Sequence, residues 1–137
     1  MGWNWPKLWN NEGLSIDGML EFGINYWDSD TRPSRNDSLV DFGLSPIVRL
    51  QFDSFTFFGA RPFIEGGVGF HVFTDDKFGD KDFGIPFAFA PTGGAGVRFG
   101  VDERFELAYR YQHLSNAGLS DSNPGIDFHL LRLSYHF

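Results

Sequence analysis

The chain has 137 residues, a formal net charge of −7, no cysteine, and 17 residues each of Phe and Gly. The few Lys and Arg residues are scattered, so the clustered basic surface of a nucleic-acid-binding protein is excluded. Without cysteine, the chain has neither a disulfide framework nor thiol chemistry. No apolar run reaches the roughly 18 residues that a membrane-spanning helix needs, so any passage through a membrane has to be made by strands.

Alternation of apolar with polar or small residues is the main pattern, and it predicts antiparallel strands separated by turn-rich segments. In chain order, the expected strands cover residues 19–26, 39–52, 62–73, 87–99, 105–115 and 127–137. The second of these is too long for an ordinary soluble strand and suits a tilted membrane strand. Pro86 and Pro91 predict a bulge or a bent edge in the fourth.

The polar face of these strands carries charges of both signs, separated by glycines. Its charged residues are Glu21, Asp41, Arg49, Glu65, Arg98, Glu106, Arg110 and Arg132. A soluble antiparallel sandwich would also alternate, but mixed charges on one face favour a narrow lumen, with aromatic and branched residues facing lipid. The predicted fold class is all-β: a single domain over residues 1–137, forming an antiparallel up-and-down transmembrane β-barrel in the bacterial outer membrane.

The number of strands is a separate question, because bacterial single-chain barrels have even numbers, starting at about eight. Residues 2–10 contain Trp3, Trp5 and Trp9, and we interpret them as the remainder of a seventh strand in an interfacial aromatic belt. We therefore expect an eight-stranded barrel of which this chain lacks the first strand and the signal peptide. A seven-stranded or open sheet is the alternative.

Three residues near the end of the chain could carry chemistry. His113 and Ser115 are two residues apart on one strand, so their side chains share a face. Asp127 begins the next strand, which returns antiparallel beside His113 and directs all three side chains toward lipid. A carboxylate that orients an imidazole, which in turn deprotonates a serine, is a recurring hydrolase triad, and Asn116 is a candidate oxyanion donor. The alternative is a set of polar neighbours near the lipid headgroups.

The run His113-Leu114-Ser115-Asn116-Ala117-Gly118-Leu119, followed by Asn123, Gly125 and Asp127, resembles the catalytic segment of the lipid A 3-O-deacylase (PagL) family, and residues 62–69 resemble its midsection. The resemblance implies an eight-stranded outer-membrane serine esterase that removes the 3-O-linked acyl chain of lipid A and so modifies lipopolysaccharide. It assigns Ser115 as nucleophile, His113 as base and Asp127 as acid, where the family usually has the longer Glu. It places Asn116, Gly118 and Asn123 around the oxyanion as site support.

Other functions remain open at this point. A small barrel that binds lipid without catalysis is one alternative, and a phospholipase or acyltransferase barrel with a different acyl substrate is another. Lipid A or lipopolysaccharide and the outer-membrane lipids are the expected partners, and a homodimer is left open. We predict no cofactor and no metal site, and we interpret the acidic cluster of Asp75, Asp76, Asp80 and Asp82 as a solvated loop.

Overall fold

The computed structural model describes residues 2–5, 7–28, 38–79 and 81–136. Asp80 of the expected acidic loop and Phe137 of the expected last strand lie outside these ranges. The described residues form strands and one short 3-10 turn, η1 (Val101–Glu103). Across the same ranges, no helix has the length and apolar character needed to cross a membrane.

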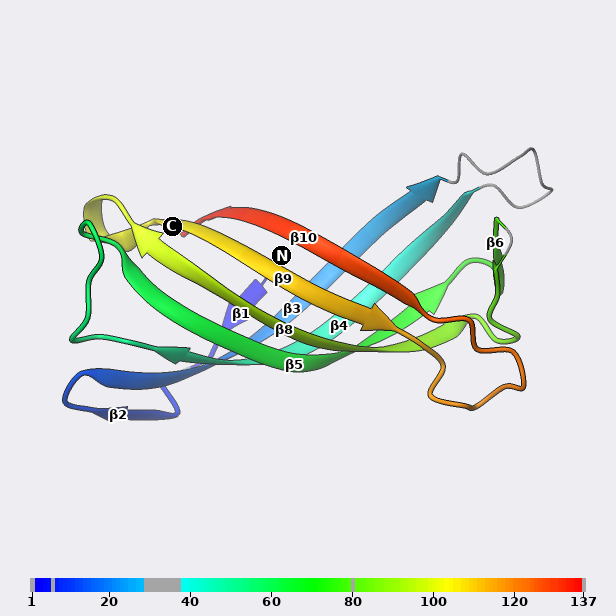
Figure 1. Cartoon of the computed structure of the whole chain (residues 1–137), viewed down its shortest axis with the longest axis horizontal. Helices are drawn as coiled ribbons and strands as arrows, with labels where there is room; N and C mark the ends of the chain where they lie inside the picture. The colour runs from blue at the N-terminus through cyan, green and yellow to red at the C-terminus, as the bar shows by residue number, and fades with distance from the viewer. Residues whose placement is uncertain (1, 6, 29–37, 80, 137) are drawn as a thin grey trace.

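One antiparallel sheet contains nearly all of the strands, in the order β1-β3-β4-β5-β8-β9-β10, with β2 also paired to β3 (Figure 1). Its strands are β1 (Gly2–Asn4), β2 (Trp9–Asn11), β3 (Leu14–Asp28), β4 (Ser38–Gln51), β5 (Arg61–Phe73), β8 (Phe87–Phe99), β9 (Phe105–Leu114) and β10 (Ile126–Tyr135). A small hairpin, β6 (Lys77–Phe78) with β7 (Lys81–Asp82), stands apart from it. All six long strands are therefore confirmed in their expected order.

The segment at the beginning of the chain pairs along β3 as an interrupted strand. Between β1 and β2, Trp5 N donates to Gly18 O and Leu8 N donates to Ile16 O, both at 2.8 Å, so the pairing continues across the gap. Within the described residues, β10 pairs with β9 alone and β1 with β3 alone, so the sheet curves into a half-barrel with two open edges (Figure 1).

The two faces of the half-barrel differ in the way that the alternation predicts. On β4, Phe42 and Val48 are exposed on the outer wall, whereas Asp41 and Arg49 are buried inside. The same division runs through the neighbouring strands, so large apolar side chains cover the outside. Exposed apolar residues in such numbers are typical of a lipid-facing wall and not of a soluble surface.

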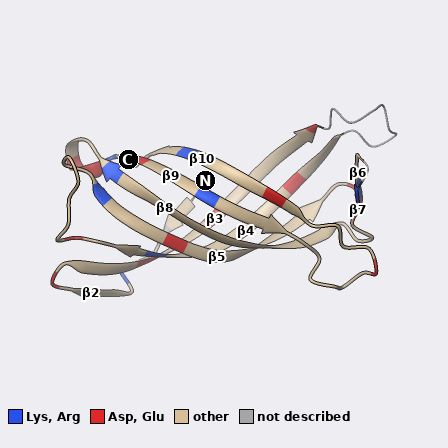
Figure 2. Cartoon of the chain, in the orientation of Figure 1, with Lys and Arg blue, Asp and Glu red and all other residues tan. Residues whose placement is uncertain are grey.

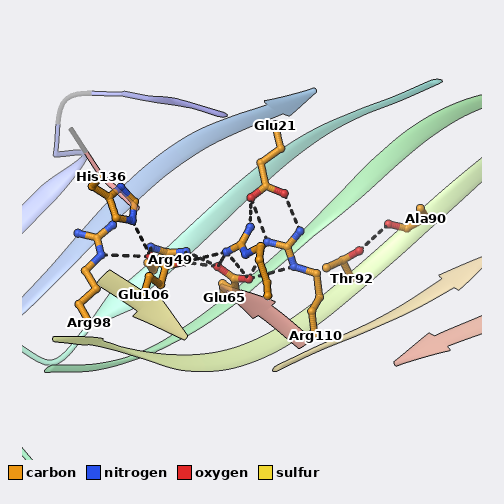
Figure 3. A network of polar contacts seen from close by, with 10 residues as sticks. Glu21, Arg49, Glu65, Ala90, Thr92, Arg98, Glu106, Arg110 and His136 are labelled. Atoms are coloured by element: carbon orange, nitrogen blue, oxygen red, sulfur yellow. Dashed lines mark hydrogen bonds and ion pairs between the residues drawn. The ribbon is translucent and has the colours of Figure 1, made fainter. Parts of the chain in front are cut away.

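The middle of the lumen is filled by a network of ion pairs from the six long strands (Figures 2 and 3). Glu65 of β5 accepts hydrogen bonds from Arg49 Nη2 at 2.6 Å and Arg110 Nη2 at 2.7 Å, and Arg132 approaches it at 3.4 Å. Glu21 and Glu106 complete the acidic side of the network. The expected lumen of paired charges is confirmed, and these pairs join strands that are not neighbours in the sheet.

The lumen near the end of β9 is apolar. Its buried cluster consists of Leu39, Phe73, Ala88, Ala90 and Leu114, with Trp27, Phe78 and Phe128 packed against it. Trp27 of β3 and Phe128 of β10 lie with ring centroids 4.3 Å apart, so this cluster also connects the two ends of the sheet. The cluster includes Leu114, which lies between His113 and Ser115, so the chain that carries these two residues is anchored in a packed core.

The expected bulge in β8 is wrong. Pairing of β8 with β5 keeps a single register from Arg61↔Arg98 to Val72↔Phe87, and β8 is a central strand of the sheet. Pro91 points outward and lies opposite the break between the Thr92↔Gln112 pair and the isolated Phe89↔Ser115 bridge with β9. Because proline lacks an N–H, it interrupts the ladder without inserting an extra residue.

The connections differ in length at the two ends of the strands. Residues 12–13, 52–60 and 100–104 connect strands at one end, whereas residues 74–79 and 81–86, with the β6–β7 hairpin, and residues 115–125 belong to the longer connections at the other (Figure 1). Outer-membrane barrels have short periplasmic turns and longer extracellular loops. Ser115 stands at the base of one of the longer loops, so the candidate triad lies at the end that corresponds to the extracellular side of such barrels.

Candidate functional site

His113 and Asp127 form a direct pair on the outer wall. They are partners in the β9–β10 register, and His113 Nδ1 lies 2.5 Å from Asp127 Oδ1. The side chains are 40% and 55% exposed, so the pair stands open to the surroundings of the barrel. The hydrogen bond to the carboxylate places the proton of the neutral imidazole on Nδ1 and leaves Nε2 as the basic nitrogen. The shorter acid therefore does reach the imidazole.

Ser115 lies one residue beyond β9, on the same face as His113. Its backbone is fixed to β8, because Phe89 N donates to Ser115 O at 2.7 Å and Ser115 N donates to Phe89 O at 3.0 Å. Its Oγ makes no hydrogen bond to any described residue. The structure thus brings the three predicted residues together on one face and holds the acid–base half of the arrangement. Serine–histidine contacts are often loose in the absence of substrate.

Tyr111 is a member of this cluster that the sequence analysis missed. Its hydroxyl donates to Asp127 Oδ1 at 2.8 Å, the same oxygen that pairs with His113. The pattern contained the information, because Tyr111 shares the outer face of β9 and is a diagonal neighbour of Asp127 across the pair of strands. From sequence alone, a tyrosine on this face is expected only as part of the lipid-facing aromatic surface.

Asn116 organises the loop that follows Ser115, and it is completely buried. Its Nδ2 donates to Phe83 O at 2.8 Å and to Ser122 O at 2.7 Å, which uses both amide hydrogens. Its Oδ1 accepts from Gly118 N at 2.9 Å. These bonds tie the loop after β9 to the loop between β5 and β8. They are the bonds of a supporting residue, and oxyanion donation by Asn116 stays a prediction.

Asn123 supports the loop after β9, and Gly125 lies beside the imidazole of His113. Asn123 Oδ1 accepts a hydrogen bond from Asn116 N at 3.0 Å, which closes the loop between them. Gly125 has a φ of +60°, and a Cβ at this position would lie 3.0 Å from His113 Cε1 and 3.5 Å from Nε2. A glycine is needed here both for the left-handed backbone and for the close approach to the basic edge of the imidazole.

A polar cavity lies elsewhere, inside the half-barrel. It measures about 420 Å³, and its polar lining includes Glu21, Asn25, His71, Arg110, Gln112 and Arg132. None of the three triad residues lines it, because they occupy the opposite face of the strands. Among the described residues, no three His, Asp or Glu side chains converge as metal ligands.

The comparisons with known proteins agree with one another. The family model described as Lipid A 3-O-deacylase (PagL) matches residues 1–136. The chain is 35% identical over 136 residues to "Lipid A deacylase PagL" of Bordetella bronchiseptica, covering 96% of this chain and 71% of that protein. It is 29% identical over 132 residues to the Pseudomonas aeruginosa protein of the same name, covering 96% and 72%.

A solved structure gives the same answer for the fold. The "Crystal structure of the outer membrane enzyme PagL" matches with a TM-score of 0.84 and 25% sequence identity, covering 100% of this chain and 87% of that one. The family match over nearly the whole chain, the relatives and the structural similarity lead to one assignment: this chain belongs to the lipid A 3-O-deacylase (PagL) family.

Proposed function

We propose that this protein removes the 3-O-linked acyl chain of lipid A, with Ser115 as nucleophile, His113 as general base and Asp127 as the acid that orients the imidazole. As a member of the family, the protein is an outer-membrane ester hydrolase that acts on lipid A. The observation that carries the finer proposal is the 2.5 Å contact between His113 Nδ1 and Asp127 Oδ1, beside Ser115 on the outer wall.

The chemistry follows from this geometry. His113 Nε2 takes the proton of Ser115 Oγ as the oxygen attacks the ester carbonyl, and Asp127 stabilises the imidazolium that forms. The imidazolium then returns its proton to the departing sugar hydroxyl, which leaves the acyl chain on Ser115. Water, deprotonated by the same nitrogen, releases the fatty acid and restores the serine. Each step uses groups that this chain supplies, together with water.

The position of the three residues suits a lipid substrate. They face outward at the extracellular end of the strands, and apolar side chains cover the outer wall toward the other end. An amphiphile whose ester lies at the boundary between headgroup and acyl chains presents that ester at this depth. The substrate therefore reaches Ser115 from the membrane without entering the lumen.

Mass spectrometry of lipid A tests the proposal, using Gram-negative cells that export the protein to the outer membrane. Wild type is expected to remove one hydroxyacyl chain, whereas Ser115→Ala and His113→Ala each lower deacylation by about 10³-fold or more. The mobility of unheated samples in gel electrophoresis checks that each variant is folded.

Two outcomes would contradict the proposal. Full activity of folded Ser115→Ala would remove the serine from the chemistry. Release of fatty acid from phospholipid, with lipid A unchanged, would assign the same residues to a phospholipase.

A further inference from the structure

We infer that Tyr111 is a positioning residue of the triad: its hydroxyl holds the Asp127 carboxylate in the one orientation that pairs with His113. The inference rests on the proposed roles of Ser115, His113 and Asp127 and adds a fourth residue to them. Tyr111 reaches neither Ser115 nor His113 by a hydrogen bond in the described structure, so it acts through the acid.

The first argument is geometric. Tyr111 OH and His113 Nδ1 bind the same oxygen, Oδ1, at 2.8 Å and 2.5 Å. Two donors on one oxygen determine both torsions of a short side chain, because turning the carboxylate breaks both hydrogen bonds at once. His113 lies directly opposite Asp127, and Tyr111 lies diagonally, two register positions further along on the same face.

The second argument is the exposure of the acid. The Asp127 side chain is 55% exposed, and no other described residue donates a hydrogen bond to it. Buried catalytic acids are held by the packing around them, but an acid on an outer wall has little packing to restrain it. The Tyr111 hydroxyl supplies this restraint from a ring whose own position is set by the sheet.

The third argument is the setting of the ring. The Tyr111 ring contacts the His129 ring, with centroids 5.5 Å apart. His129 is itself bonded through Nδ1 to Tyr109 OH at 2.6 Å. Tyr109 therefore has the same outward-facing phenol two residues earlier on β9, but it bonds to His129 and not to Asp127. The chain thus contains a matched control for the loss of one tyrosine hydroxyl.

The experiment compares Tyr111→Phe with Tyr109→Phe in the purified full chain, with lipid A in detergent micelles and release of hydroxy fatty acid as the readout. Loss of a hydrogen bond to a charged group is expected to lower kcat about tenfold in Tyr111→Phe, with KM unchanged. Tyr109→Phe should retain the wild-type kcat. Ser115→Ala, inactive in the same assay, verifies the underlying triad independently.

A second comparison separates positioning from packing. In an Asp127→Ala background, Tyr111→Phe is expected to cause no further loss, because the group on which the hydroxyl acts is absent. A full tenfold loss in that background, or wild-type kcat in Tyr111→Phe alone while Ser115→Ala is inactive, would overturn the inference and leave the proposed function intact. Activity in Ser115→Ala would instead refute the proposed function.

Discussion

Strands β9 and β10 carry two sets of paired charges on opposite faces, and the two sets are built differently. On the inner face, Arg110 and Arg132 join Glu21, Glu65 and Glu106 in a network in which most groups have several partners. On the outer face, one carboxylate serves one imidazole and one tyrosine hydroxyl.

The difference shows how one pair of strands serves both structure and chemistry. Each inner carboxylate of the network pairs with at least two arginines, and the Glu65 side chain is fully buried, so these groups are held in ion pairs. The outer pair leaves His113 Nε2 and Ser115 Oγ without partners among the described residues. We therefore expect inner-face mutations to change stability and outer-face mutations to change catalysis.

The largest expected effect is a loss of stability caused by a mutation on the inner face. Glu65→Gln keeps the side-chain volume but leaves the buried Arg49 and Arg110 without their shared carboxylate, which is expected to destabilise the barrel by about 3–5 kcal/mol. Urea unfolding in detergent micelles measures the loss. The activity of each folded molecule should stay near wild type, and a large fall in kcat at unchanged stability would contradict the division of roles.

Asp102→Asn is the matched control for this change. Asp102 also pairs with an arginine, Arg104 at 3.5 Å, but its side chain is 72% exposed in the turn between β8 and β9. Exposed pairs contribute about 0–1 kcal/mol, so this variant should unfold close to wild type.

The next effect lies on the outer side. Asp127→Asn removes the charge that stabilises the imidazolium and is expected to lower kcat on the order of 10²-fold, less than the loss of Ser115 or His113. The unfolding midpoint should not change, because the side chain is exposed. Equal losses in Asp127→Asn and Ser115→Ala would mean that the acid does more than orient and stabilise the imidazole.

The smallest expected effect on kcat comes from a change to the backbone beside the imidazole. Gly125→Ala places a methyl group 3.0 Å from His113 Cε1 on a residue with φ of +60°. We expect kcat to fall about tenfold and stability to fall by about 1 kcal/mol, since the residue must either strain or push the imidazole away. Gly118→Ala is the control, because a Cβ there meets no atom within 4 Å although φ is also positive. Equal kcat losses in both variants would indicate loop strain alone.

Much of the fold could be predicted because membrane strands alternate with a period of two. The sequence alone predicts that Val48 faces outward and Arg49 inward, because lipid and lumen impose opposite preferences on neighbouring residues. The prediction for Pro91 was wrong. A bulge or a bent edge was expected, but the proline only removes one backbone N–H donor from the strand ladder. Such accommodation depends on which neighbour faces the missing N–H.

The site was predictable where residues share a strand or a hairpin. His113, Ser115 and Asp127 follow from parity and from one turn. The bond from Asn116 to Phe83 does not, because it joins two loops whose paths are irregular. The position of Tyr111 on the outer face could be predicted, but its hydrogen bond to Asp127 could not, because a tyrosine on a lipid-facing strand is commonly an interfacial aromatic.

The lumenal network also limits the order in which the barrel can assemble. Glu65 contacts Arg132 across 67 positions of the chain, and Glu21 contacts Arg132 across 111. Contacts between such distant positions form late, after most of the loop-closure entropy has been lost. Until β10 arrives, Glu21 and Glu65 each lack one of their arginine partners. Docking of the last strand is therefore the step that completes the ion pairs of the lumen, because Arg132 contacts Glu21, Glu65 and Glu106.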